Sequence, residues 1–448
     1  MPKPVHYRIR PHRPEAHLFE VELTVPKPAD EQVLSLPAWI PGSYMIRDFA
    51  KNIVTLTATD SEGDVETEKL DKQTWRCTGA RGTLSVRYEV YAWDLSVRSA
   101  HLDTTHGYFN GTSVFLQVHG RDDAPCTVEL LPPSGDDFSD WRVATTLPRD
   151  GAELYRFGGY RAADYDELID HPVEMGRFTL ITFEAAGIPH EMALTGRHRA
   201  DTGRLAADLK KICEYHAGLF GPPPVERYLF QTMVVGEGYG GLEHRSSCSL
   251  MCSRGDLPLA GEEKAGDRYR NFLGLCSHEY FHTWNVKRIK PAAFQPCDLS
   301  REVNTPLLWA FEGITSYYDD LGVKRAGLIS EQQYLETLGQ SITRVLRNPG
   351  RLKQSISESS FDAWTKFYKQ DENAPNAIAS YYVKGSLAAL GLDLIIRAET
   401  DGKRSLDDVM RALWERHGKP AVGVTADGIE ALMEEVAGIS LKPYLDLA

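Results

Sequence analysis

Long apolar runs and an excess of positive charge are both missing from this chain. No stretch of the 448 residues approaches the roughly 18 consecutive apolar residues that a membrane-spanning helix needs. Lysine and arginine number 50 against 63 acidic residues, so the formal net charge is −13. An acidic surface is a poor match for nucleic acid or for an anionic membrane. We therefore expect neither as a partner.

Cysteine is scarce and odd in number. The seven cysteines are scattered along the chain, which is typical of reduced thiols rather than of a disulfide framework. The first 17 residues are rich in basic side chains and proline and lack the apolar centre of a secretion signal. These features predict a cytoplasmic location, while the oligomeric state stays unknown at this stage.

The most informative stretch present is H-E-x-x-H at residues 278–282. Apolar residues upstream recur mostly at steps of three or four, which predicts a helix with Pro291 as a plausible end. His278 and His282 then lie one turn apart on one face, where two imidazoles can hold one zinc ion. Glu279 is placed to act as a general base on a water. The alternative is a core helix with two hydrogen-bonded histidines.

A catalytic zinc needs a third protein ligand and one open position. Glu312 follows His282 by 30 residues, in an otherwise apolar and aromatic segment where a buried carboxylate needs a partner. A zinc ion would be that partner. The alternative is a glutamate at a helix start that faces solvent. We predict one zinc ion per chain, bound by His278, His282 and Glu312.

Three other stretches leave alternatives open. Tyr381 and Tyr382 offer phenols before a predicted helix, either as packing residues or as donors to a developing oxyanion. The glycines of residues 236–241 follow a predicted strand, and indicate a turn or a backbone edge that something approaches closely. The basic run 287–290 is expected to be a solvated face, with contact to a peptide carboxylate as the alternative.

Hydrophobic periodicity divides the chain into two parts. Alternation of period two predicts strands at 19–25, 54–58, 84–92 and 178–183, and an apolar run predicts another at 228–235. From about residue 265 the pattern is mostly helical, apart from a polar stretch at 350–378. We predict an α+β fold with a β-sandwich-like domain over 1–170. A catalytic domain follows over 171–448, β-rich to about 260 and helical from about 261.

Four segments resemble the glycyl aminopeptidase family of zinc metallopeptidases, gluzincins related to the aminopeptidase N group. They are HEYFHTWNVKRIKP from His278, EGITSYYD from Glu312, LPAWIPGSYMIRDFA from Leu36 and DLSVRSAHLDTTHGYFNG from Asp94. The resemblance covers nearly the whole chain and implies a β-rich N-terminal domain before a thermolysin-like catalytic domain with C-terminal helices. Family members commonly carry a PDZ-like domain after the helical region, and we expect this chain to lack it.

The resemblance also implies roles for individual residues. Gly240-Gly241-Leu242-Glu243 matches a family strand motif, so Glu243 is expected to bind the free α-amino group of a substrate that lies along Gly240 and Gly241. His244 stands where the aminopeptidase N group has asparagine, and its role stays open. The family's tyrosine motif fits Tyr382-Val383-Lys384-Gly385, which selects Tyr382 as the transition-state donor.

These observations predict a zinc-dependent aminopeptidase whose partners are peptides with a free N-terminus. The resemblance implies a preference for N-terminal glycine or alanine. The alternatives are a zinc endopeptidase on the same scaffold and a catalytically silent binding protein. Glu243 separates the first two possibilities, because a carboxylate that anchors a free amine suits only an exopeptidase.

Overall fold

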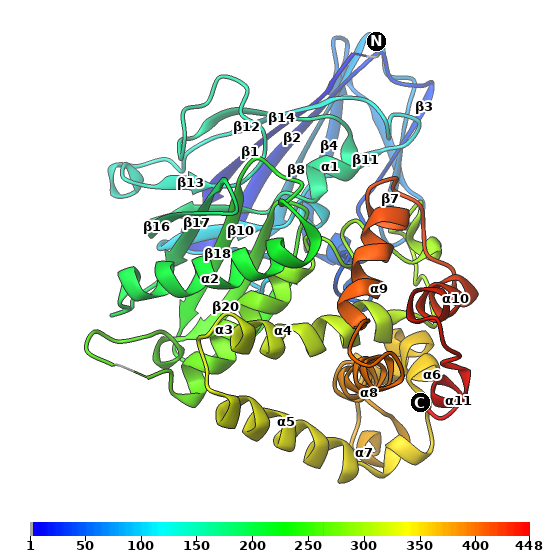
Figure 1. Ribbon diagram of the computed structural model, residues 1–448. Helices are drawn as coiled ribbons and strands as arrows, with labels where there is room; N and C mark the ends of the chain where they lie inside the picture. Colours follow the sequence, from blue (N-terminus) through cyan, green and yellow to red (C-terminus); the bar gives the residue numbers. More distant parts are fainter. Residues whose placement is uncertain (1–2, 263) are drawn as a thin grey trace.

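The computed structural model describes residues 3–262 and 264–448, and its N-terminal part is built from three β-sheets. Figure 1 shows these blue-to-cyan strands at one end of the molecule. The largest sheet has the order β14-β12-β1-β2-β8-β4-β5. Its strands are β1 (Val5–Arg13), β2 (Leu18–Pro26), β4 (Ile53–Asp60), β5 (Gly63–Asp64), β8 (Thr83–Tyr91), β12 (Cys126–Leu130) and β14 (Gly158–Ala162).

Two four-stranded sheets complete this part, with the orders β11-β3-β7-β6 and β13-β15-β10-β9. Their strands are β3 (Glu31–Ser35), β6 (Glu66–Lys69), β7 (Thr74–Thr78), β9 (Ala100–Leu102), β10 (His106–Phe109), β11 (Gln117–Val118), β13 (Arg142–Ala144) and β15 (Val173–Gly176). The short helix α1 (Tyr165–Ile169) precedes the last of them.

Alternation of apolar and charged residues along the chain explains why the strands of the largest sheet bury one face. In β2 the apolar residues Val21 and Leu23 are buried, and each faces a buried residue of β8 across the antiparallel pair, Tyr88 and Val86. The charged residues between them stay on the other face of the sheet, as alternation requires. The strands predicted at 19–25, 54–58 and 84–92 are therefore confirmed in kind as β2, β4 and β8.

A mixed five-stranded sheet of order β16-β17-β18-β20-β19 begins the second part. Helix α2 (Thr202–Phe220) packs against it (Figure 1). β19 is an edge strand, paired only with β20 within this sheet, so among the described residues no strand covers its other edge. The strands are β16 (Phe178–Ala185), β17 (Ile188–Thr195), β18 (Tyr228–Val235), β19 (Gly240–Glu243) and β20 (Ser247–Ser253).

The remainder is helical, drawn from green to red in Figure 1. The helices are α3 (Asp267–Phe281), α4 (Ile314–Arg325), α5 (Glu331–Leu346), α6 (Ile356–Phe361), α7 (Ala374–Ala377), α8 (Val383–Glu399), α9 (Leu406–Leu413), α10 (Ala426–Ala437) and α11 (Lys442–Leu445). The stretch 350–378, expected to be irregular, contains α6, α7 and a π-helical turn at Ala363–Phe367. Apolar residues buried between these helices and the mixed sheet form one continuous core.

One predicted boundary is wrong. α3 ends at Phe281 rather than near Pro291, and His282 is its C-terminal cap. The chain turns at once, because Val286 adopts a positive φ of 78° and Asn285 bridges to Ile289. His282 nevertheless keeps helical dihedrals, with φ −62° and ψ −15°, so the one-turn spacing of the two histidines survives.

All seven cysteines are free thiols, and all but Cys297 are buried. In the described part of the chain, helices of membrane-crossing length and apolarity are not found.

Candidate active site

Two packed helices bring the predicted ligand residues together. His278 and His282 lie at the end of α3, and Glu312 lies in a π-helical turn, Trp309–Gly313, that leads into α4. α3 and α4 pack side by side. A π-helical turn adds a residue to the helical turn and changes the direction of its side chains, and such turns are frequent at functional sites.

The three side chains converge on one point. Glu312 Oε2 lies 3.5 Å from His278 Nε2 and 3.3 Å from His282 Nε2. All three ligand atoms lie within 4.8 Å of one another. Two imidazole nitrogens and a carboxylate oxygen are the donor set of a catalytic zinc site, which leaves a fourth position open.

Both histidines are held through their other ring nitrogen. His278 Nδ1 is 3.1 Å from Asp319 Oδ2, and His282 Nδ1 is 3.0 Å from the backbone oxygen of Asn285. The amide of Asn285 donates to the Phe311 carbonyl at 3.0 Å, which ties the end of α3 to the turn that carries Glu312. Outer partners of this kind fix the tautomer and the orientation of metal-binding imidazoles.

The donor set fits a cation. When each Nδ1 donates its proton to the oxygen beside it, each Nε2 presents a lone pair toward Glu312. Two lone pairs and a carboxylate that face one another repel unless a positive charge lies between them. Burial raises the pKa of Glu312, whereas positive charge on His282 and His278 lowers it to about 2, so a cation at this point keeps the carboxylate ionised.

Glu279 lies beside this point and has the properties of a base. Its carboxyl is buried, and burial raises the pKa of Glu279 to about 7. Its Oε2 has no hydrogen-bond partner among the residues that the structure describes. A Cβ on Gly241 would lie only 1.9 Å from Glu279 Oε1, so β19 approaches the carboxyl as closely as a glycine permits.

Three phenols line the site on the side of α8. Tyr382 precedes α8, its ring centroid is 6.3 Å from that of His278, and its hydroxyl is 3.1 Å from the hydroxyl of Tyr368. Burial and the charge of Glu312 raise the pKa of Tyr382 well above its usual range, so its O–H stays a donor. Tyr381 is fully buried and packs against Phe367, which suits a structural role.

The N-terminal part reaches into the site, which the sequence analysis did not predict. Tyr44 donates from its hydroxyl to Glu312 Oε1 at 2.9 Å, across 268 residues of sequence. Gly42 lies against Glu243: a Cβ there would be 2.5 Å from both carboxylate oxygens. Gly42 and Tyr44 belong to the segment from Leu36 to Ala50, which resembles the family. That resemblance was the only feature of the sequence that pointed to them.

Glu243 is buried at the end of β19, and its carboxylate lies within 4.8 Å of ligand atoms of Glu279 and His282. Burial raises the pKa of Glu243. Within residues 3–262 and 264–448 no cationic side chain forms an ion pair with it. A cavity of about 50 Å³ adjoins Glu243 and is narrowed by Tyr44 and Phe294.

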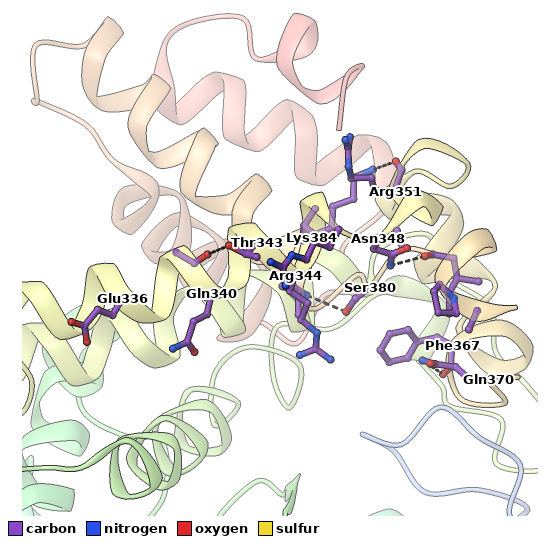
Figure 2. A pocket seen from close by; sticks show the side chains of 18 residues that line it. Glu336, Gln340, Thr343, Arg344, Asn348, Arg351, Phe367, Gln370, Ser380 and Lys384 are labelled. Carbon is purple, nitrogen blue, oxygen red and sulfur yellow. Dashed lines mark hydrogen bonds between the residues drawn. The ribbon is translucent and has the colours of Figure 1, made fainter. Parts of the chain in front are cut away.

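A much larger cavity, of about 960 Å³, lies between α5 and the start of α8 (Figure 2). Its wall is basic, with Arg344, Arg347, Arg351 and Lys384 against a single acidic residue, Glu336. It does not include the convergence point of the two histidines and Glu312. The small cavity beside Glu243 likewise does not include that point, but Tyr44 and Glu243, which lie against the site residues, form part of its wall.

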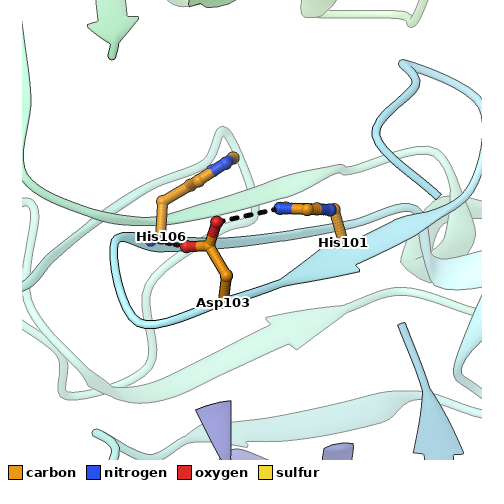
Figure 3. A group of neighbouring side chains, drawn as sticks. All are labelled: His101, Asp103 and His106. Atoms are coloured by element: carbon orange, nitrogen blue, oxygen red, sulfur yellow. Dashed lines mark hydrogen bonds and ion pairs between the residues drawn. The ribbon is translucent and has the colours of Figure 1, made fainter. Parts of the chain in front are cut away.

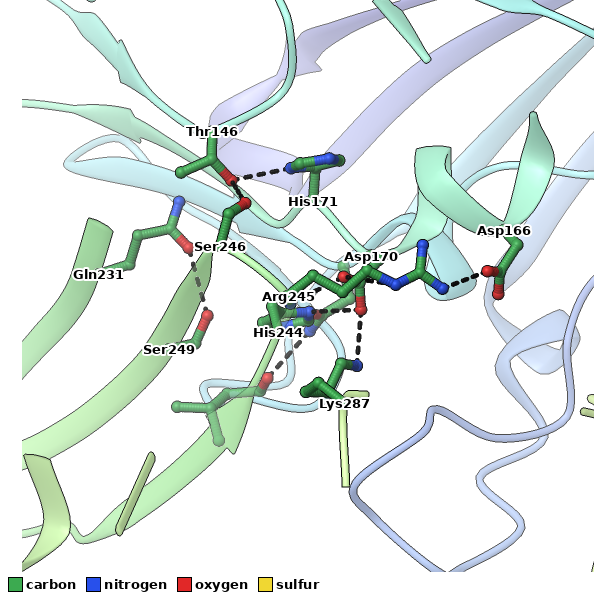
Figure 4. Close-up of polar contacts among 12 residues, drawn as sticks. Thr146, Asp166, Asp170, His171, Gln231, His244, Arg245, Ser246, Ser249 and Lys287 are labelled. Carbon is green, nitrogen blue, oxygen red and sulfur yellow. Dashed lines mark hydrogen bonds and ion pairs between the residues drawn. The ribbon is translucent and has the colours of Figure 1, made fainter. Parts of the chain in front are cut away.

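The basic run after α3 corrects a prediction. Lys287 is buried rather than solvated, and its Nζ lies 2.6 Å from Asp170 Oδ1 (Figure 4). Arg288 donates to the backbone oxygens of Thr283 and Arg245. Lys287 follows the zinc-type helix and Asp170 follows α1, so the ion pair joins the two parts of the molecule.

His244 belongs to the same group of charges. Its Nδ1 is 3.6 Å from Asp170 Oδ1, which is ion-pair distance but too long for a hydrogen bond. Burial lowers the pKa of His244. Its place beside Asp170, behind Glu243, indicates a supporting position rather than contact with substrate.

A second group of possible ligands lies on the β9–β10 hairpin (Figure 3). Protein partners already account for it. His106 Nδ1 is 3.0 Å from Glu174 Oε1, and His101 Nε2 is 3.4 Å from Asp103 Oδ2. Asp103 Oδ1 accepts the backbone N–H groups of Thr105 and His106, which closes the hairpin turn. We interpret this group as structural.

Family models match both parts of the chain. Residues 6–177 match the Peptidase M61 N-terminal domain, and residues 271–388 match the M61 glycyl aminopeptidase. A search of curated proteins found no match.

Solved structures match along nearly the whole chain. An aminopeptidase N family protein from Idiomarina loihiensis is 47% identical, with a TM-score of 0.97 over 99% of this chain and 75% of that one. Two structures of an M1 zinc metallopeptidase from Deinococcus radiodurans have TM-scores of 0.59 and 0.57. They are 13% and 15% identical, over 99% of this chain and 93% and 92% of theirs. The latter two show likeness of fold alone.

The β-rich N-terminal part, the thermolysin-like second part and the H-E-x-x-H helix thus define a zinc-type metallopeptidase. Within that class the chain belongs to the M61 glycyl aminopeptidase family. Family membership supports the activity of a zinc aminopeptidase that acts on peptides.

Proposed function

We propose that this family member removes N-terminal glycine or alanine from peptides, with one zinc ion held by His278, His282 and Glu312. The observation that carries the proposal is Glu243, a buried carboxylate without a cationic partner in the described ranges, close to Glu279 and His282. A substrate ammonium would be its partner. Such an anchor beside the reacting groups limits cleavage to the first peptide bond.

Each residue then has one task. A zinc ion held by His278, His282 and Glu312 would polarise the carbonyl of the scissile bond and lower the pKa of water. Glu279, with a pKa raised to about 7 by burial, takes the proton of the attacking water and passes it to the leaving amine. Tyr382 donates its O–H to the oxygen on which negative charge develops. Gly240 and Gly241 let the peptide backbone lie against β19.

The size of the space beside Glu243 supports the preference for small residues. The cavity of about 50 Å³ has the room of only a few water molecules, and the rings of Tyr44 and Phe294 stand in its wall. A hydrogen or a methyl group fits such a space, whereas a leucine or phenylalanine side chain would have to displace one of these rings.

The experiment compares Glu243→Ala with the wild-type enzyme on glycyl peptides that carry either a free or an acetylated N-terminus. We expect the variant to lose at least about a hundredfold in kcat/KM on the free amine, because a buried charge-assisted contact is lost. Glu336→Ala, an exposed glutamate on α5, is the matched control and should behave as wild type. Equal losses on free and acetylated peptides would instead favour an endopeptidase.

A panel of aminoacyl anilides tests the size preference. Glycyl and alanyl anilides should be cleaved with a higher kcat/KM than leucyl and phenylalanyl anilides. Glu279→Gln should retain zinc in metal analysis and cleave none of them measurably. Zinc binding without hydrolysis by the wild type would support a binding protein instead.

A further inference from the structure

The direction of β19 determines which residues of the strand lie beside each part of a bound peptide. Glu243, the proposed amine anchor, is at its C-terminal end, and Gly241 faces Glu279 two residues earlier. Extended chains advance about 3.4 Å per residue. A peptide anchored at Glu243 and lying along this edge therefore has its scissile bond near Gly241. The residue that follows the scissile bond lies near Gly240.

An arginine from the N-terminal part lies at the Gly240 end of β19. Arg98, in the loop before β9, donates from Nη2 to the backbone oxygen of Gly241 at 3.2 Å. A Cβ on Gly240 would lie 3.3 Å from Arg98 Nη1. Arg98 is also close enough to Tyr368 for its charge to lower the phenol's pKa, which burial and Glu312 raise. Arg98 thus lies between β19 and the phenols that line the site.

A second arginine lies next to the first. Arg47 follows the segment that carries Gly42 and Tyr44 into the site, and its Nη2 donates to Ser43 Oγ at 2.7 Å. Its Nε is buried, and within residues 3–262 and 264–448 it has no hydrogen-bond partner. Burial, and after it the charge of Arg98, lowers the pKa of Arg47, while the charge of Asp94 raises it.

No carboxylate in the described part of the chain forms an ion pair with either arginine. Some other half-buried arginines, such as Arg227 and Arg325, form such pairs, whereas Arg142 and Arg288 donate to backbone oxygens instead. Guanidinium carries five N–H donors in a fork that matches a carboxylate, and Arg98 uses one of them on Gly241. Asp94 offsets part of the charge of Arg47, and an anion that binds between or beside the two guanidinium groups stabilises them further.

We propose that Arg98, supported by Arg47, binds a substrate carboxylate on the leaving-group side of the scissile bond. The ligand class is a short peptide that carries a negative charge at the residue after the bond. The charge comes from the C-terminal carboxylate of a dipeptide or from an acidic side chain. This assignment rests on the proposed function, since it takes its direction from Glu243 as the amine anchor. It makes Arg98 a specificity-determining residue.

The test measures kcat/KM on glycyl-alanine with a free C-terminus and on glycyl-alanine amide. The wild-type enzyme should prefer the free acid by about tenfold or more, mainly through a lower KM, because a charge-assisted bidentate contact is lost in the amide. In Arg98→Gln the ratio of acid to amide should fall toward one. Arg98→Lys should keep part of the preference, and Arg47→Gln should lower it partway.

Glycyl-aspartyl amide and glycyl-asparaginyl amide distinguish the two sources of charge. A preference for the aspartyl compound that Arg98→Gln removes assigns the subsite to an acidic side chain. A preference only for the free dipeptide assigns it to the C-terminus. Arg87→Gln, on the exposed face of β8, is the matched control and should keep the wild-type ratio. Circular dichroism and thermal midpoints identify any variant that fails to fold, in which case Arg98→Lys and Arg47→Gln decide.

The proposal is overturned if the wild type cleaves acid and amide equally well, or if the preference persists in Arg98→Gln. Both results would leave the aminopeptidase activity itself intact. Failure of the wild type to release glycine from any of these compounds is a different result. It would remove the proposed function, and the carboxylate subsite with it.

Discussion

At the scale of single residues, the carboxylate of Glu312, the proposed third zinc ligand, is held by a residue of the N-terminal part. Glu312 offers Oε2 to both histidines, while its Oε1 accepts a hydrogen bond from Tyr44 at 2.9 Å. Tyr44 is fully buried, and its ring stacks on Phe294 with centroids 5.9 Å apart. The hydroxyl therefore has little freedom, and it fixes which oxygen of Glu312 turns toward the histidines.

Tyr44→Phe removes this hydroxyl and leaves the ring in place. We expect zinc affinity to fall by about tenfold to a hundredfold, the usual effect of losing a hydrogen bond to a metal ligand. Competition with a zinc-binding dye measures it. Tyr7→Phe is the control, since Tyr7 is an equally buried phenol that donates to the Leu116 carbonyl at 2.7 Å, far from the site. Equal zinc affinity in the two variants would contradict the proposed role of Tyr44.

The limits of sequence reasoning are clearest at this scale. His278, His282 and Glu312 could be proposed as ligands from the sequence. The H-E-x-x-H spacing and a carboxylate in an apolar segment both indicate a bound cation. Tyr44 and Glu312 are 268 residues apart, and no local pattern relates them. Lys287 was misjudged for the same reason, since its partner Asp170 lies in a distant segment and only the fold makes the pair.

At the scale of elements, β19 combines two requirements. As the edge strand of the mixed sheet it would present backbone to the proposed substrate, and its glycines allow α3 to approach. The sequence indicated a close approach at residues 236–241 but could not name the group that approaches. The structure places the Glu279 carboxyl there, so the glycine at position 241 is a requirement of Glu279 as much as of the substrate.

Gly241→Ala tests that requirement. The added Cβ would lie 1.9 Å from Glu279 Oε1, so the carboxyl has to move away from its present position. We expect kcat to fall by at least about a hundredfold, since misplacement of a reacting group by 1 Å has effects of this size. Gly339→Ala in the middle of α5 has open space around its Cβ and should keep full activity. It should also raise stability by about 0.5–1 kcal/mol. A normal kcat in Gly241→Ala would show that catalysis does not require the present position of the Glu279 carboxyl.

At the scale of the whole molecule, the N-terminal part is a wall of the site as well as a separate set of sheets. Tyr108 of β10 donates to Ser249 Oγ of β20 at 2.7 Å, and Trp39 donates to the Asp298 backbone oxygen at 3.0 Å. Together with the Asp170–Lys287 pair they are three separate polar contacts across the junction. The two parts are therefore expected to unfold together. The sequence predicted both parts from their periodicity, but the contacts between them follow no period.

Buried histidines make the stability of this assembly depend on pH. Burial lowers the pKa of both His171 and His190 to about 4, against about 6.5 in an unfolded chain. Between these values the unfolded chain binds protons that the folded one does not, so their contribution is complete above about pH 6.5. It is lost as the pH falls toward 4, by up to about 1.4 kcal/mol per pH unit for each histidine.

Urea unfolding at several pH values should show this slope in the free energy of unfolding. His190→Gln should show a shallower slope than wild type, because one titrating group is gone. Zinc release in acid also destabilises the protein, but to the same extent in both, so it cancels in the difference. Parallel curves of unfolding free energy against pH for the two proteins would mean that His190 binds its proton in the folded protein at the same pH as in the unfolded chain.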